Sequence, residues 1–213
     1  MFRQTAVFLA IALTGACRST GGVDAKAPII QPGAPGQASH AVSAATATDL
    51  SQVQFIGADI KFMQGMIGHH TQAIEMTELL PSRTASADMK KLAQRIQVSQ
   101  IDEIKMMQGW LQSRGQPIPA PGAMHMHGAT LMPGMLTDDE MAALAAAKGA
   151  EFDRLFLSGM IKHHNGALTM VSELFASPGA AQESEVFAFA SDVDADQRME
   201  INRMSTMLKE LGR

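Results

Sequence analysis

One eighteen-residue segment occurs twice in the chain. DIKFMQGMIGHHTQAIEM begins at Asp59, and DRLFLSGMIKHHNGALTM begins at Asp153. With a shift of 94 residues, the two copies share Asp, Phe, Gly, Met, Ile, both His, Ala and Met. An internal repeat of this kind predicts two copies of one structural unit.

Both copies have the periodicity of an α-helix. In the first copy, one face of the helix spans about 80° to either side of Met66 when each residue advances by 100°. It holds Asp59, Phe62, Met63, Met66, His69, His70, Ala73 and Met76. Pro81 is expected to end this helix, and Gly115 is expected to cap the next one. A capping box at Thr137–Glu140 predicts a shorter helix that ends at Lys148–Gly149. The long helices predicted are Asp49–Leu80, Ala85–Arg114, Ala150–Ala176 and Ser184–Leu211.

The partner helices repeat as well. With a shift of 97 residues, Gln100, Glu103, Ile104, Met107, Leu111 and Gly115 recur as Gln197, Glu200, Ile201, Met204, Leu208 and Gly212. Each half is therefore a helical hairpin with one apolar face, and two such hairpins can bury their faces against each other. The sequence predicts an all-α four-helix bundle over 49–213. It consists of a first hairpin (49–115), a linker that crosses the bundle (116–136) and a second hairpin (137–213).

The N-terminal segment, residues 1–17, has the features of a secretory signal. Its apolar run, Ala6 to Leu13, is too short for a stable membrane anchor. LTGAC resembles the lipobox of bacterial lipoproteins, in which Cys17 would be lipidated, and an ordinary signal peptide is the alternative. Residues 18–48 are rich in Gly, Pro, Ala, Ser and Thr, which predicts a disordered tether. We expect a periplasmic or cell-envelope protein that a lipid anchor attaches to a membrane.

Four of the seven histidines lie in the two repeated pairs. A single buried histidine is usually a hydrogen-bonded structural residue, but two pairs related by a repeat favour a shared role. Methionines lie one turn before, and two turns after, histidines of each pair. Imidazole and thioether together favour Cu(I), and by the same softness silver. The candidate ligands in the helices are His69, His70, Met66, Met76, His163, His164, Met160 and Met170.

Four acidic residues share the apolar faces. A buried carboxylate needs a partner, and it could accept an N–H from a ligating histidine and so fix the tautomer of the ring. Alternatively, these carboxylates bind backbone amides or arginines at the ends of the bundle. The candidates for this supporting role are Asp59, Glu103, Asp153 and Glu200.

The linker offers a second candidate metal site. GAMHMHGATLMPGM crowds sulfur and imidazole groups into a short loop, which is typical of a flexible metal-capture segment. The alternative is that these methionines pack on the surface of the bundle. The residues concerned are Met124, His125, Met126, His127, Met132 and Met135.

The doubled words also resemble a known family. MIxHHxxA, QxxEIxxM, MPGMLT and FDRLFLSGMIKHHNGA are similar to segments of the bacterial family catalogued as domain of unknown function 305. The resemblance covers Asp49 to Arg213. It implies a ferritin-like four-helix bundle and, as in some members, copper binding in the periplasm.

Several function classes are disfavoured. No Glu-x-x-His occurs, which argues against a di-iron carboxylate site, and the Ser-hydrolase, P-loop and dinucleotide motifs are absent. A net charge of −4 without a basic block argues against nucleic acid as a partner. We expect a protein that binds copper, chiefly Cu(I), and buffers it, transfers it to a copper-transfer protein or confers resistance, without catalysis.

Two other functions stay open at this point. One is a redox enzyme that uses copper or iron with an open coordination position. The other is a structural or interaction module whose histidine pairs are hydrogen-bonded internally. If the histidines bind the metal, binding should weaken near their ordinary pKa of about 6.5, whereas thioethers do not titrate.

Overall fold

The computed structural model describes residues 28–31, 38–48, 53–120 and 131–212. The chain divides into two compact units, residues 1–50 and 51–213. In the first unit, strands β1 (Ile29–Gln31) and β2 (His40–Val42) pair antiparallel, and helix α1 (Ala44–Thr48) follows. These short elements lie within the range for which the sequence predicts a tether without regular structure. The predicted signal segment and Cys17 lie outside the described residues.

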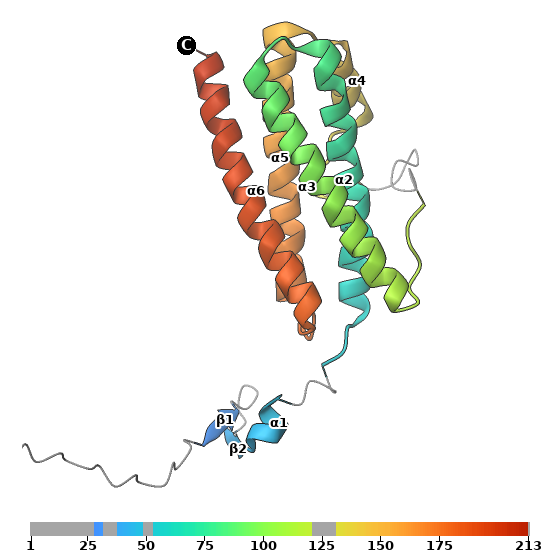
Figure 1. The fold of residues 1–213 in the computed structure, drawn as a ribbon, viewed down its shortest axis with the longest axis vertical. Helices are drawn as coiled ribbons and strands as arrows, with labels where there is room; N and C mark the ends of the chain where they lie inside the picture. The colour runs from blue at the N-terminus through green and yellow to red at the C-terminus, as the bar shows by residue number, and fades with distance from the viewer. Residues whose placement is uncertain (1–27, 32–37, 49–52, 121–130, 213) are drawn as a thin grey trace, which may run out of the picture. The chain divides into compact units, whose positions relative to one another are not determined.

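The second unit is a bundle of four long helices (Figure 1). They are α2 (Gly57–Arg83), α3 (Ala87–Ser113), α5 (Gly149–Ala176) and α6 (Ser184–Leu211), with the short helix α4 (Asp138–Ala146) before α5. Helices α2 and α3 form one hairpin, α5 and α6 form the other, and α2 packs against α5. Residues 53–120 and 131–212 contain no strand. The predicted all-α fold of two repeated hairpins is confirmed.

Helix α2 begins later than the periodicity predicts, at Gly57 instead of Asp49. Asp59 sits in the first turn, where its Oδ2 accepts a hydrogen bond from the backbone amide of Ile56 at 2.8 Å. This bond satisfies an amide that the helix itself leaves without a partner. The apolar pattern continues upstream of this cap, and periodicity alone does not reveal where the cap lies.

Helix α2 also continues past Pro81, which was expected to end it, as far as Arg83. A proline in the last turn removes only one helical hydrogen bond. The final turn is held from outside, because Arg83 Nε donates to the carbonyl oxygen of Ala145 at 2.7 Å.

The turn between α4 and α5 lies earlier in the chain than predicted. Helix α4 ends at Ala146, before the predicted end at Lys148–Gly149. Gly149 has a φ of +61° and already begins α5. A positive φ is accessible to glycine without strain, so Ala147 and Lys148 are enough to connect the two helices.

The bundle has two apolar clusters with a polar layer between them. On α2 the first cluster ends at Ile67 and the second begins at Ala73, while on α5 the second cluster ends at Met160 and the first resumes at Ala167. All four long helices change from apolar to polar at this level. We call the residues between the clusters the histidine layer: His69, His70, Gln100, Glu103, His163, His164, Gln197 and Glu200.

The end of the linker, residues 131–136, crosses α2 and α5 at the level of the histidine layer; we call it the crossing segment. Gln72 on α2 donates from Nε2 to the carbonyl oxygen of Leu136 at 2.9 Å and accepts from the amide of Leu136 at 2.8 Å. On α5, a Cβ atom at Gly166 would lie 1.9 Å from the carbonyl oxygen of Pro133. The crossing segment thus needs a glycine on one helix and a side-chain amide on the other.

None of the helices among the described residues is both long enough and apolar enough to cross a bilayer.

Candidate metal centre

All four histidines of the repeat are fully buried, and each uses its Nε2 atom in a hydrogen bond. His70 Nε2 lies 2.6 Å from Glu103 Oε2, and His164 Nε2 lies 2.7 Å from Glu200 Oε2. Each first helix of a hairpin therefore presents a histidine to a glutamate on its own second helix.

The other histidine of each pair bonds to a backbone carbonyl. His69 Nε2 lies 3.0 Å from the oxygen of Pro133 in the crossing segment. His163 Nε2 lies 2.9 Å from the oxygen of His69 itself. A carbonyl oxygen only accepts hydrogen bonds, so both Nε2 atoms donate.

These bonds decide which nitrogen of each ring holds the proton. With Nε2 protonated, the Nδ1 atom of a neutral imidazole keeps its lone pair. The Nδ1 atoms of His69, His70, His163 and His164 are all buried and without a hydrogen-bond partner. Buried polar atoms are normally paired, and four such lone pairs in one layer match what a metal ion requires of histidine ligands.

The rings of His69 and His163 lie against each other, and each has the other histidine of its pair nearby. The centroids of His69 and His163 are 3.8 Å apart, with the ring planes at 37°. His70 follows His69 at 6.4 Å, and His164 follows His163 at 6.2 Å. Residues adjacent in sequence thus point to different places, and the close contact is between the two halves of the repeat.

Burial keeps the central pair of rings neutral. Desolvation, with a smaller contribution from the neighbouring His70, lowers the pKa of His69 to about 3. Desolvation and the other three imidazoles hold the pKa of His163 well below its ordinary value. Neutral imidazole is the form that binds a metal, so these two rings are already in the binding form.

Glu103 has the opposite balance. Burial opposes its ionisation, but the hydrogen bond from His70, together with the bond from Ser99, leaves its pKa below the ordinary value. Ser99 Oγ donates to Glu103 Oε1 at 2.8 Å. Glu103 is therefore a carboxylate acceptor with a partner on each oxygen.

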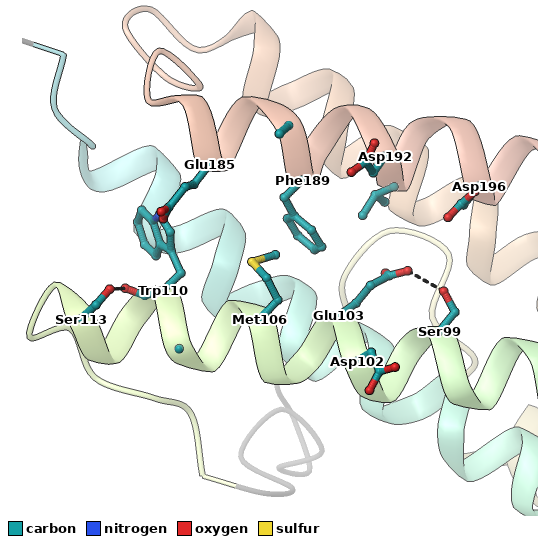
Figure 2. Close-up of a pocket in the computed structure, with 13 residues that line it drawn as sticks. Ser99, Asp102, Glu103, Met106, Trp110, Ser113, Glu185, Phe189, Asp192 and Asp196 are labelled. Carbon is teal, nitrogen blue, oxygen red and sulfur yellow. Dashed lines mark hydrogen bonds between the residues drawn. The ribbon is translucent and has the colours of Figure 1, made fainter. Parts of the chain in front are cut away.

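A groove between α3 and α6 reaches the histidine layer at Glu103 (Figure 2). Its volume is about 820 Å³, and its walls include Asp102 on α3 and Asp192 and Asp196 on α6. The Glu103 side chain is 19% exposed, whereas Glu200 is 8% exposed. The two His–Glu pairs are alike in bonding but differ in their access to solvent.

Comparison with known proteins places these residues in a family. The profile of the family described as Domain of unknown function (DUF305) matches residues 59–208, which hold both repeats and the whole histidine layer. The chain belongs to the DUF305 family. No functionally curated protein matches it.

Solved DUF305 structures share the fold. A Streptomyces coelicolor DUF305 protein described as secreted has 31% sequence identity and a TM-score of 0.64, over 73% of this chain and 94% of that chain. A Deinococcus radiodurans DUF305 fragment has 28% identity and a TM-score of 0.63, over 73% and 98%. CopM in its Cu(I)-bound form has 31% identity and a TM-score of 0.57, over 71% and 96%. CopM has also been solved with Cu(II) and with silver bound.

The carboxylates predicted to support the histidines separate into two groups in this DUF305 chain. Glu103 and Glu200 accept from the histidines, as described above. Asp59 lies at the end of the bundle, where Oδ1 accepts from the amide of Ala181 at 2.7 Å and Oδ2 serves Ile56. Asp153 is buried with an unpartnered Oδ1 and has no bond to a histidine. For Asp59, the alternative of backbone binding at a bundle end describes its contacts.

The methionines predicted as ligands lie on both sides of the histidine layer. Met66 and Met170 lie in the first apolar cluster, and Met76 and Met160 lie in the second. Met135 is buried, and Met132 is half-buried in the crossing segment. Met124, His125, Met126 and His127 lie outside the described residues, so their role stays a prediction.

Sequence reasoning missed two parts of the centre. The carbonyl of Pro133 holds the His69 ring, and Gln72 fixes the segment that brings that carbonyl there. A backbone carbonyl can belong to any residue, so the sequence does not mark the Pro133 acceptor. Gln72 has a glycine at the equivalent position of the second copy, so the repeat does not mark it either. Gln100 and Gln197 each have an unpartnered side-chain oxygen in the layer. They recur in the repeat, but recurrence alone does not assign them a role.

The histidine layer is not a preformed multidentate cage. Among the described residues, no three His, Cys, Asp or Glu side chains are grouped as a metal site. Structural zinc sites require four such ligands in tetrahedral arrangement. The donors present suit an ion that accepts few, soft ligands.

Proposed function

We propose that this DUF305 protein binds copper, mainly as Cu(I), in the histidine layer, and that it buffers or transfers the metal or confers resistance to it. One observation supports this most directly: four buried imidazoles each bond through Nε2 and leave Nδ1 without a hydrogen-bond partner. Cu(I) accepts imidazole and thioether donors in low coordination numbers. Silver is expected to bind at the same donors.

The relatives support the choice of metal. CopM, at 31 to 32% identity, has structures with Cu(I), Cu(II) and silver bound. The Streptomyces coelicolor relative is described as secreted, and we propose an extracytoplasmic location for this chain too. Lipid attachment at Cys17 and a copper-transfer partner remain part of the proposal.

The decisive experiment is Cu(I) competition titration of the full chain with a chromogenic chelator near pH 7. The variants are His70→Gln with His164→Gln, and His69→Gln with His163→Gln. Glutamine retains an N–H donor for the Glu or carbonyl partner but removes the imidazole lone pair. His40→Gln is the matched control, because His40 is an exposed residue of β2 in the other unit.

We expect either double variant to lose Cu(I) affinity by tenfold or more while His40→Gln binds like the parent. Unfolding by urea must show that the variants remain folded. Folded double variants that bind Cu(I) as the parent does would show that the layer is an internally hydrogen-bonded structural element. We also propose that the protein performs no turnover, which an oxygen-consumption assay with Cu(I) or Fe(II) tests directly.

A further inference from the structure

Two glycines occupy equivalent positions in the two copies of the repeat, Gly65 on α2 and Gly159 on α5. Next to each lies the terminal methyl of a methionine from the other hairpin. Met170 Cε is 3.3 Å from the position that a Cβ would occupy at Gly65, and Met76 Cε is 3.3 Å from the same position at Gly159. Met76 and Met170 are themselves equivalent in the repeat, so the arrangement is two-fold related.

The crossing segment breaks this symmetry. At Gly65 the second neighbour is Met132 Sδ, at 3.4 Å from the Cβ position. At Gly159 it is Leu136 Cδ2, at 3.2 Å. One glycine therefore lies beneath two thioether side chains, and the other lies beneath one thioether and one alkyl group.

The two places also differ in access. A cavity of about 590 Å³ opens over Gly65, with Met132 and Met170 in its wall and Lys61 and Glu173 among its other lining residues. At Gly159, both Met76 and Leu136 are buried in the second apolar cluster. An ion from solvent can reach the methionine pair over Gly65, whereas its counterpart is sealed by packing.

We propose that Met132 and Met170 form a binding site for a soft monovalent cation, Cu(I) or Ag(I), over Gly65. Thioethers are polarizable, uncharged donors that select such ions. The missing Cβ of Gly65 provides the space in which the two side chains converge. Gly65 is one helical turn before His69, so the site lies next to the histidine layer but uses none of its donors. This inference rests on the proposed soft-metal function and adds a second site to it.

The test uses the full chain labelled with ¹³C in the methionine methyl groups, and Ag(I) as a probe that does not change oxidation state. Met132→Leu and Met170→Leu identify the two methyl signals and remove one donor each with little change of volume. Met76→Leu is the matched control, because Met76 is the repeat equivalent of Met170 at the closed glycine.

In the parent, we expect the methyl signals of Met132 and Met170 to shift together as Ag(I) is added. In either single variant, the signal of the remaining partner should no longer shift over the same range of Ag(I). Met76→Leu should leave both shifts unchanged. Gly65→Ala should weaken the coupled response because its Cβ would lie close to both side chains, whereas Gly159→Ala should not.

Imidazole nitrogen signals recorded in the same titration separate this proposal from the proposed function. If the Nδ1 signals respond but the two methyl signals do not, the methionine site is wrong and the histidine site stands. If the methyl signals respond and the imidazole signals do not, the histidine site is wrong and the methionine site stands. Methyl signals that shift with different midpoints, or a Met170 shift that persists in Met132→Leu, would overturn the paired site.

Discussion

Gln72 and Gly166 occupy the same position in the two copies of the repeat, and both hold the crossing segment, by opposite means. Gln72 forms two hydrogen bonds with the backbone of Leu136. Gly166 contributes the absence of a side chain, which lets the backbone of Pro133 and Gly134 lie directly on α5. The two copies of the repeat thus carry different residues at this position, and together these residues fix the path of the linker.

Gly166→Ala should destabilise the bundle. The added Cβ would meet the Pro133 carbonyl oxygen at 1.9 Å, so the crossing segment must move away, at a cost of about 2 kcal/mol or more. Gly109→Ala, inside α3, is the control, because its Cβ would meet nothing within 4 Å. That change should stabilise by about 0.5–1 kcal/mol through helix propensity. Urea unfolding measures both, and equal effects of the two changes would contradict the close contact.

Gln72→Leu should also destabilise the bundle, for a different reason. It leaves the amide and carbonyl of Leu136 buried and unpaired, which costs about 1–3 kcal/mol for each group. Gln64→Leu, which removes only an exposed bond to Pro117, should change stability by less than about 0.5 kcal/mol. Amide hydrogen exchange at Leu136 should accelerate only in Gln72→Leu. Unchanged exchange there would show that the segment is held by other contacts.

Replacement of Glu103 or Glu200 by glutamine should weaken Cu(I) binding without removing a ligand. Either change removes the carboxylate that keeps the proton on Nε2 of its histidine, and such supporting contacts are worth about 10–100-fold in metal affinity. Asp194→Asn on α6 is the control, since it disturbs only an exposed pair with Arg198. Chelator competition near pH 7 measures the Cu(I) affinity of each variant relative to the parent. Parent-like affinity in both glutamate variants would show that these carboxylates do not support metal binding.

The stability of the free protein should fall as the pH falls from about 6.5 towards 3. The folded pKa of His69 is about 3, below the ordinary value of 6.5, so in this window the unfolded chain binds a proton that the folded chain does not. The contribution is fully present above about 6.5 and is lost at about 1.4 kcal/mol per pH unit. Urea unfolding at several pH values should show a slope smaller by one proton in His69→Gln, and an identical slope would contradict the lowered pKa.

The same burial changes the expected pH dependence of metal binding. From ordinary pKa values, a histidine site should lose about eightfold in affinity per imidazole between pH 7 and 5.5. The pKa of His69 is about 3, and burial holds the pKa of His163 well below its ordinary value, so we expect these two rings to add little of that loss. Cu(I) affinity of the His70→Gln, His164→Gln double variant, which retains them, should fall less than about threefold over this interval. A fall of eightfold or more would show that the central rings titrate normally.

The pairing of helices and the His–Glu bonds could be predicted because both follow from the repeat. Glu103 and Glu200 recur at one position of the second helices, so a common partner in the first helices follows. Asp59 shares the same face but sits in the first turn, where a carboxylate caps amides. Periodicity specifies which face of a helix a residue lies on, but not how far along the helix it lies. It therefore places Asp59 in the same group as Glu103 and Glu200.

The grouping of the methionines depended on contacts between hairpins. Helical spacing associates Met170 with His163 on its own helix, whereas in the structure its methyl lies over Gly65 of the other hairpin. Met132 comes from a segment without periodicity, and its position depends on the bonds of Gln72 and His69. Such contacts follow from how two helices and a linker meet, which single-helix patterns do not encode.

The two apolar clusters above and below the histidine layer would tolerate many axial alignments, because one methionine or leucine fits against another almost equally well. The layer removes this freedom. Sliding α3 by one turn against α2 would take Glu103 away from His70 and leave a buried ring donor unpaired, at a cost of about 1–3 kcal/mol. The same holds for α6 and α5 through Glu200 and His164. The residues proposed to bind the metal thus also fix the axial alignment of the helices. A chain with apolar residues in their place would have a larger apolar core but would lose a unique helix register.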